Sequence, residues 1–414
     1  MKNFKLLQGI VTSGVIATTA AMGSFVAKVQ AATFTLPIEA AAKATGVDVL
    51  RDRYRLDGSG ITIGVISDSF ATAKTFDASG NLDTYTTNIA NGYLPSGVNV
   101  LKDYAEPDAQ DEGRAISQLI HAVAPEAKLA FYTGTGGVDS FSQAIQALAA
   151  AGADIIVDDI GLLPQNTPDG SSNLLDLEPP NGLINQAINS VFNQGISYIT
   201  DAGNDFPDVP IYGHANNPNA LTVGAVYYGN AESYSNQAYG IVIEQGQVEP
   251  FSSEGNPGSL KPDVVAPDAL PISFNLAGGS RPYNDPRFFS FFGTSISAPF
   301  TAAVAALLQQ ANPNATPTEI YNALRNTAYN PLSGFDSRRG FGLIRGDQAI
   351  LALGVQPKPT TIPEPSAAPA LLCVSVLIAG LLLKRNQHKS KAIAQPSASM
   401  TLVYSRHKQL REAS

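Results

Sequence analysis

Two patterns of apolar residues alternate along the first half of the chain. Short apolar runs between polar residues predict buried strands at residues 61–66, 128–132, 154–157 and 196–200. Longer segments with apolar residues at helical spacing predict helices at residues 111–124, 139–151 and 181–194. Because strands and helices alternate, we expect an α/β fold, with a doubly wound, mostly parallel sheet and helices on both of its faces. Ligands of such sheets bind beyond the carboxyl ends of the strands.

The second half of the chain is less regular. Strand-like runs lie at residues 220–226, 241–244 and 287–292. The segment Thr-Pro-Thr-Glu at residues 316–319 is a capping box, and it predicts a helix that ends near residue 328. The α/β pattern extends from about residue 46 to residue 354, and we interpret residues 32–355 as one domain.

A segment rich in small residues follows the sequence Gly-Thr-Ser-Ile-Ser-Ala-Pro at residues 293–299. It predicts a tight turn that leads into a helix buried on nearly all sides. Ser295 would then lie at the helix N-terminus, where free backbone N–H groups and the helix dipole stabilise negative charge. Such a position suits a nucleophilic serine. An ordinary buried helix with a Ser/Thr-rich start is the alternative.

Residues 293–299 resemble the nucleophile motif of subtilisin-like serine peptidases, Gly-Thr-Ser-x-Ser-Ala-Pro. Two further positions match that family in the same order. Asp68, directly after the first predicted strand, matches the first member of the catalytic triad, and Asn204 matches the amide that donates to the oxyanion. The resemblance implies that Ser295 attacks the peptide carbonyl. It also implies an oxyanion hole made by Asn204 and the Ser295 backbone N–H.

Glu112 occupies the position of the family's catalytic histidine, at the start of the helix predicted over residues 111–124. With a glutamate at this position, the chain resembles the sedolisins, which have the same fold and use a Ser-Glu-Asp set of catalytic residues. Their aspartate lies four residues after the glutamate, where this chain has Ile116. The resemblance therefore implies Glu112 as the general base and Asp68 as its orienting partner, on an otherwise subtilisin-like scaffold.

The four histidines are alternatives to a glutamate base. His121 lies nine residues after Glu112 and is predicted to face the opposite side of the same helix. His214, in the loop after Asn204, is the better rival, although no flanking motif marks it as a base. His388 and His407 fall in the C-terminal tail.

A carboxylate base constrains the pH dependence. A glutamate titrates near pH 4.3, about two units below histidine, and a helix N-terminus lowers that value further. Asp68 would raise the pKa of Glu112, because two close carboxylates disfavour double ionisation and share a proton. We therefore expect activity in acid that falls towards neutral pH.

Asp158 and Asp159 also follow a predicted strand, and their role stays open: preference for basic substrate side chains, cation binding or part of the carboxylate cluster. No cofactor or metal site is predicted. Sedolisins bind a structural calcium near the end of the domain, but no carboxylate cluster after Ser295 allows that site to be assigned here.

Both ends of the chain carry targeting patterns. Residues 1–31 have the order of a secretory signal peptide, with a retained membrane anchor as the alternative. Residues 356–366 are a Pro/Thr-rich linker, residues 367–383 are an uncharged segment at the short limit for a membrane span, and residues 384–414 form a basic tail that is expected to be cytoplasmic. The Pro-Glu-Pro at residues 363–365 and the segments after it resemble bacterial C-terminal sorting signals.

Composition sets further limits. The net charge of −9 argues against a nucleic-acid partner. One cysteine, Cys373, excludes a disulfide framework. We expect an exported bacterial serine endopeptidase, anchored at the membrane or cell surface, that acts on polypeptides. A catalytically inactive subtilisin-like domain that serves as a surface binding module is the alternative.

Overall fold

The computed structural model describes residues 33–161, 179–229, 231–276, 280–332 and 334–357, which belong to one compact unit. The predicted signal peptide, apolar C-terminal segment and basic tail lie outside the described residues, as do His388 and His407. Within the described ranges, no helix has the length and apolar character needed to cross a membrane.

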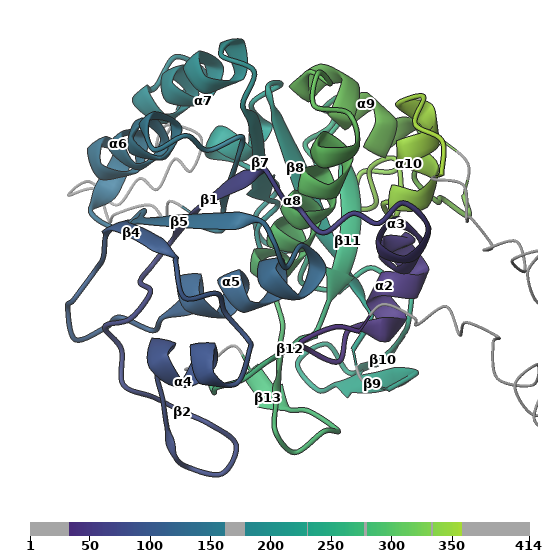
Figure 1. Ribbon diagram of the computed structural model, residues 1–414. Helices are drawn as coiled ribbons and strands as arrows, with labels where there is room; N and C mark the ends of the chain where they lie inside the picture. The colour runs from purple at the N-terminus through teal and green to yellow at the C-terminus, as the bar shows by residue number, and fades with distance from the viewer. Residues whose placement is uncertain (1–32, 162–178, 230, 277–279, 333, 358–414) are drawn as a thin grey trace, which may run out of the picture. The chain divides into compact units, whose positions relative to one another are not determined.

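A seven-stranded parallel sheet forms the centre of the fold (Figure 1). Its strands, in spatial order, are β11 (Val264–Asp268), β8 (Ala220–Tyr227), β7 (Ser197–Asp201), β6 (Ile155–Asp158), β1 (Thr62–Ser67), β5 (Lys128–Thr133) and β4 (Asn99–Lys102). All neighbours in this sheet pair in parallel. Because the strand order reverses at β1, the predicted doubly wound α/β sheet is confirmed. Ligands of such sheets bind beyond the carboxyl ends of the strands at this kind of reversal.

Helices cover both faces of the sheet (Figure 1). One apolar cluster joins α6 (Gly137–Ala150) and α7 (Leu183–Asn193) to one face. The larger cluster joins α5 (Glu112–Val123) and α8 (Thr294–Ala311) to the other face. Period-two alternation in β1 supplies both clusters, since Ile63 and Val65 belong to the larger one and Ile66 to the smaller.

The remaining elements surround this frame. The shorter helices are α2 (Glu39–Thr45), α3 (Val47–Arg53), α4 (Tyr85–Ala90), the 3-10 turn η2 (Gly213–Asn216), α9 (Pro317–Asn326) and α10 (Gly346–Ala352). Three small antiparallel sheets pair β2 (Thr75–Phe76) with β3 (Leu82–Asp83), β9 (Ser233–Asn236) with β10 (Ile241–Glu244), and β14 (Phe289–Phe291) with β12 (Leu270–Ile272) and β13 (Ser280–Pro282). The strand predicted over residues 287–292 therefore forms, but outside the main sheet.

Helix α8 is buried from Thr294 to Leu308. Small residues on this helix allow it to lie close to β6, β7, β8 and β11, and its N-terminus meets the carboxyl end of the sheet. The buried helix predicted from the small-residue run is thus confirmed, and it carries Ser295 to the edge where the strands end.

Candidate active site

The carboxyl ends of three neighbouring strands bring acidic side chains together beside α8. Asp68 follows β1 directly, Asp159 follows β6, and Asp201 is the last residue of β7. Ser295 lies in the first turn of α8 with 7% of its surface exposed. Glu112, the first residue of α5, completes the group.

Asp68 holds the start of α5 in place. Its Oδ1 accepts a hydrogen bond from the Glu112 backbone N–H at 2.8 Å, and its Oδ2 accepts from the Gln110 N–H at 2.7 Å and from the Ser69 hydroxyl at 2.9 Å. A carboxylate at a helix N-terminus stabilises the unpaired N–H groups there. Asp68 therefore orients Glu112 through the backbone, and its charge acts on the Glu112 carboxyl.

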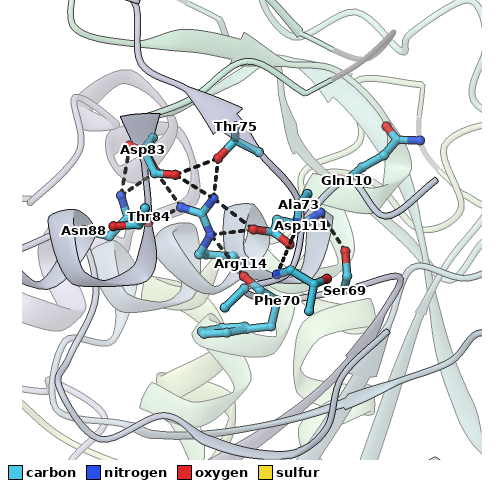
Figure 2. A network of polar contacts seen from close by, with 12 residues as sticks. Ser69, Phe70, Ala73, Thr75, Asp83, Thr84, Asn88, Gln110, Asp111 and Arg114 are labelled. Carbon is cyan, nitrogen blue, oxygen red and sulfur yellow. Dashed lines mark hydrogen bonds and ion pairs between the residues drawn. The ribbon is translucent and has the colours of Figure 1, made fainter. Parts of the chain in front are cut away.

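A buried arginine fixes the turn before Glu112 (Figure 2). Asp111 has a left-handed backbone with φ of 59°, and its Oδ1 accepts the N–H groups of Thr72 and Ala73. Arg114 is fully buried, and its guanidinium donates to Asp111 Oδ2 and to Asp83 and lies 4.0 Å from the centre of the Phe274 ring. The network joins the N-terminus of α5 to the small β2–β3 sheet and to the loop after β1.

Glu112 lies against Ser295. Its carboxyl lies within reach of a hydrogen bond from the Ser295 hydroxyl and of one shared with Asp159. Burial, followed by the charge of Asp68, raises the pKa of Glu112 to about 7, and the two hydrogen bonds oppose that rise. Desolvation therefore outweighs the lowering that the helix N-terminus alone would produce.

Asp159 belongs to the site, although the sequence left its role open. Burial and the neighbouring Glu112 raise the pKa of Asp159 well above its ordinary value. Burial also raises the pKa of Asp201 to about 6. The available sequence signal was an acidic pair at the end of a buried strand, which did not show that the two side chains point in different directions.

Asn204 and Gly293 shape a gap beside Ser295. Asn204 Oδ1 accepts the Thr294 N–H at 2.8 Å, which orients the side-chain amide and leaves its Nδ2 as the donor. A β-carbon added to Gly293 would lie 3.5 Å from Asn204 Nδ2, 3.6 Å from the Ser295 backbone nitrogen and 3.6 Å from Ser295 Oγ. Two nitrogen donors and the hydroxyl therefore lie around one small space, as an oxyanion hole requires.

The described histidines are engaged elsewhere. His214 Nε2 lies 3.0 Å from Asp158 Oδ1 and 3.3 Å from the Thr200 hydroxyl, and its ring packs edge-on against Phe141. Asp158 thus faces His214, while Asp159 faces Glu112. His121 lies in the last turn of α5, and burial and the charge of Arg51 lower its pKa.

Metal binding has no support from the described part of the chain, where no group of three or more His, Cys, Asp or Glu residues is arranged to hold an ion.

A parallel α/β sheet with a serine at the N-terminus of a buried helix and an amide donor beside it defines a subtilisin-like protein. Residues 58–342 match the model of the subtilase family, and the chain belongs to this family. Among solved structures, it is similar in fold to fervidolysin from Fervidobacterium pennivorans, with a TM-score of 0.52 and 22% identity over 77% of this chain and 46% of that chain. MycP1 from Mycobacterium smegmatis gives a TM-score of 0.50 and 20% identity over 75% of this chain and 84% of that one.

Characterised relatives carry protease names. Serine protease AprX of Bacillus subtilis is 25% identical over 295 residues, which cover 67% of this chain and 63% of AprX. An extracellular protease of Xanthomonas campestris is 30% identical over 168 residues, which cover 40% of this chain and 25% of that protein. Subtilisin Savinase of Lederbergia lenta is 26% identical over 308 residues, covering 71% and 92% respectively. The chain thus spans less than two thirds of the length of the first two relatives.

Proposed function

We propose that this chain is a serine endopeptidase in which Ser295 is the nucleophile and Glu112 is the general base. The observation that supports the proposal best is the close approach of the Glu112 carboxyl to the Ser295 hydroxyl, within reach of a hydrogen bond, beside the gap that Asn204 and Gly293 line. Nucleophile, base and oxyanion donors come from three separate segments, and they converge on one point at the carboxyl edge of the sheet.

The reaction follows from this arrangement. Glu112 accepts the hydroxyl proton as Ser295 Oγ attacks the peptide carbonyl, and the carbonyl oxygen gains negative charge. Asn204 Nδ2 and the Ser295 N–H stabilise that charge. Protonated Glu112 then donates to the leaving amine, the C–N bond breaks and an acyl-enzyme remains. Water attacks the ester, gives its proton to Glu112 and releases the carboxylic acid, and the proton returns to Ser295.

The acid-favouring profile that we propose depends on the charges around Glu112. The neighbouring charges that shift its pKa, Asp68 and Asp201, are both acidic. Because buried carboxylates repel one another, such a cluster keeps a proton below neutral pH and loses it at higher pH. Full ionisation would separate the carboxylates and disturb the geometry at Ser295, so activity should fall towards neutral pH.

Export and surface anchoring are part of the proposal, with the polypeptide substrate and the membrane as partners. They rest on the signal-like residues 1–31 and on the Pro-Glu-Pro, apolar and basic segments after residue 355. The Xanthomonas relative is named an extracellular protease, which agrees with export. Fractionation of cells that express the full chain, with and without residues 356–414, tests whether this region retains the domain at the membrane.

Fluorophosphonate labelling tests the catalytic assignment. We expect labelling of the wild-type protein at Ser295, none in Ser295→Ala, and a loss of roughly 10²–10⁴-fold in the labelling rate of Glu112→Gln, because the base is removed while its shape is kept. Equal labelling of Glu112→Gln and wild type would show that Glu112 is not the base. Folded wild-type protein that does not react at any pH would favour the binding-module alternative.

A further inference from the structure

The carboxyl group of Asp159 has an unusual environment. Asp159 as a residue is 9% exposed, and its Oδ2 accepts a hydrogen bond from the Ser67 hydroxyl at 3.1 Å. Its Oδ1 receives no N–H or hydroxyl hydrogen bond from the residues that the structure describes. A neighbour that can bring a proton to this side chain is the Glu112 carboxyl, which lies within reach of a hydrogen bond. Two carboxyl groups can form that bond only when one of them is protonated.

The other carboxylates near this pair have more donors. Asp68, after β1, accepts three hydrogen bonds, from two backbone N–H groups and a hydroxyl. Asp201, on β7, accepts from the Thr294 hydroxyl at 2.8 Å and from the Gly203 N–H at 3.0 Å. His214 acts on Asp201 but pairs with Asp158. Burial raises the pKa of Asp68 and of Asp201 too, but their hydrogen-bond donors favour the ionised form and oppose that rise, so the shared proton is assigned to Glu112 and Asp159.

We propose that Asp159 is the positioning residue of the catalytic base: it shares one proton with Glu112 and holds the Glu112 carboxylate towards Ser295. This inference rests on the proposed function and deepens it. In the working state Asp159 is protonated and donates to Glu112, which leaves the Glu112 carboxylate free to accept the Ser295 proton. Asp159 keeps its own proton throughout the cycle, so the transfers described above remain balanced.

Topology explains why a strand supplies this partner. The position four residues after Glu112 on α5 holds Ile116, whose side chain is fully buried in the apolar cluster and cannot orient a carboxylate. The end of β6 lies next to the end of β1 in the sheet, and Asp159 follows β6 directly. The proton partner of the base therefore comes from β6 and not from α5.

The pH profile of hydrolysis tests the proposal. In Asp159→Asn the amide still donates to Glu112 but has no proton to lose. We expect this variant to keep activity in acid within about 10-fold of wild type and to retain it at neutral pH, where wild-type activity falls. Asp159→Ala removes the orienting donor and should lower kcat by roughly 10²-fold at every pH with little change in KM. Asp154→Asn, at the other end of β6, is the matched control and should leave the profile unchanged. The inference would be overturned if the activity of Asp159→Asn rose and fell at the same pH values as that of the wild type.

A second measurement does not require turnover. In the Ser295→Ala background, infrared difference spectra across a pH titration report protonated carboxyl groups directly. We expect Asp159→Asn to remove one protonated carboxyl that persists towards neutral pH and to lower the pH at which Glu112 ionises. Unchanged Glu112 titration would refute proton sharing. Failure of wild-type protein to react with fluorophosphonate would instead refute the proposed function, so the two failures are distinguishable.

Discussion

The proposed oxyanion hole permits a sharp test with a single methyl group. The α-carbon of Gly293 lines the gap, and a β-carbon there would lie 3.5 Å from Asn204 Nδ2 and 3.6 Å from the Ser295 nitrogen. An oxyanion needs to lie about 2.7–3.1 Å from the same two nitrogens. The methyl group of Gly293→Ala and the oxyanion would therefore compete for one space, and the substitution removes access to both donors.

The magnitude follows from the number of donors. Removing one oxyanion donor costs roughly 10²–10³-fold in kcat. Because Gly293→Ala blocks two, we expect a loss of at least about 10³-fold, or about 4 kcal/mol in the activation free energy. Gly293 has φ of +142°, so the variant also carries backbone strain of about 1–3 kcal/mol in folding stability.

Kinetics with a chromogenic peptide and a thermal melt separate these effects. Gly60→Ala is the matched control, since Gly60 has φ of +86° and open space around its α-carbon. It should lose stability but keep kcat. Asn204→Ala removes one donor and should lower kcat. In the double variant with Gly293→Ala, kcat should fall little further than in Gly293→Ala alone, because the space is already blocked. A Gly293→Ala enzyme within 10-fold of wild-type kcat, or losses that multiply in the double variant, would refute the assignment of the hole.

Two further predictions concern stability. Arg114→Met should lower the free energy of unfolding by about 3–5 kcal/mol, because Asp83 and Asp111 stay buried without their counter-ion; a melt within about 1 kcal/mol of wild type would contradict this. Burial raises the pKa of Glu249, which hydrogen-bonds with the buried Asp268, to about 7. In the unfolded chain the pKa of Glu249 is near 4.5, and below that pH the contribution of Glu249 to stability is fully present. Between pH 4.5 and pH 7 the unfolded chain loses a proton that the folded chain keeps. The free energy of unfolding should therefore fall by roughly 3 kcal/mol over this range. Glu249→Gln should remove most of this slope in denaturant titrations, and an unchanged slope would contradict the assignment.

Much of the frame could be predicted from residue order. The helix predicted over residues 111–124 is found as Glu112–Val123, and the strand predicted over residues 61–66 as Thr62–Ser67. These elements carry strong local patterns, because one face or both faces are buried. The edge strand β4 was missed, since its residues are exposed on both faces and show no buried pattern. The strand predicted over residues 287–292 forms in a small antiparallel sheet, and its sequence does not reveal which sheet it joins.

The candidate site shows the same division. Ser295, Asn204 and Asp68 could be proposed from the sequence, because each lies in a short segment whose turn or helix start is set by neighbouring residues. The environment of Glu112 could not. Its pKa depends on burial and on charges from β1, β6 and β7, which are distant in sequence and close only because the parallel strands end at one edge of the sheet.

The sequence by itself determined which elements form and where the helix with Ser295 begins, and it carried the proposal that the Glu112 carboxylate takes the place of the family's histidine. Only the tertiary structure decided which acid meets that carboxylate. Asp158 and Asp159 are adjacent, but period-two alternation at the end of β6 turns one towards His214 and the other towards Glu112. Local patterns report which face is buried, whereas the partner on that face is set by how the strands and helices pack.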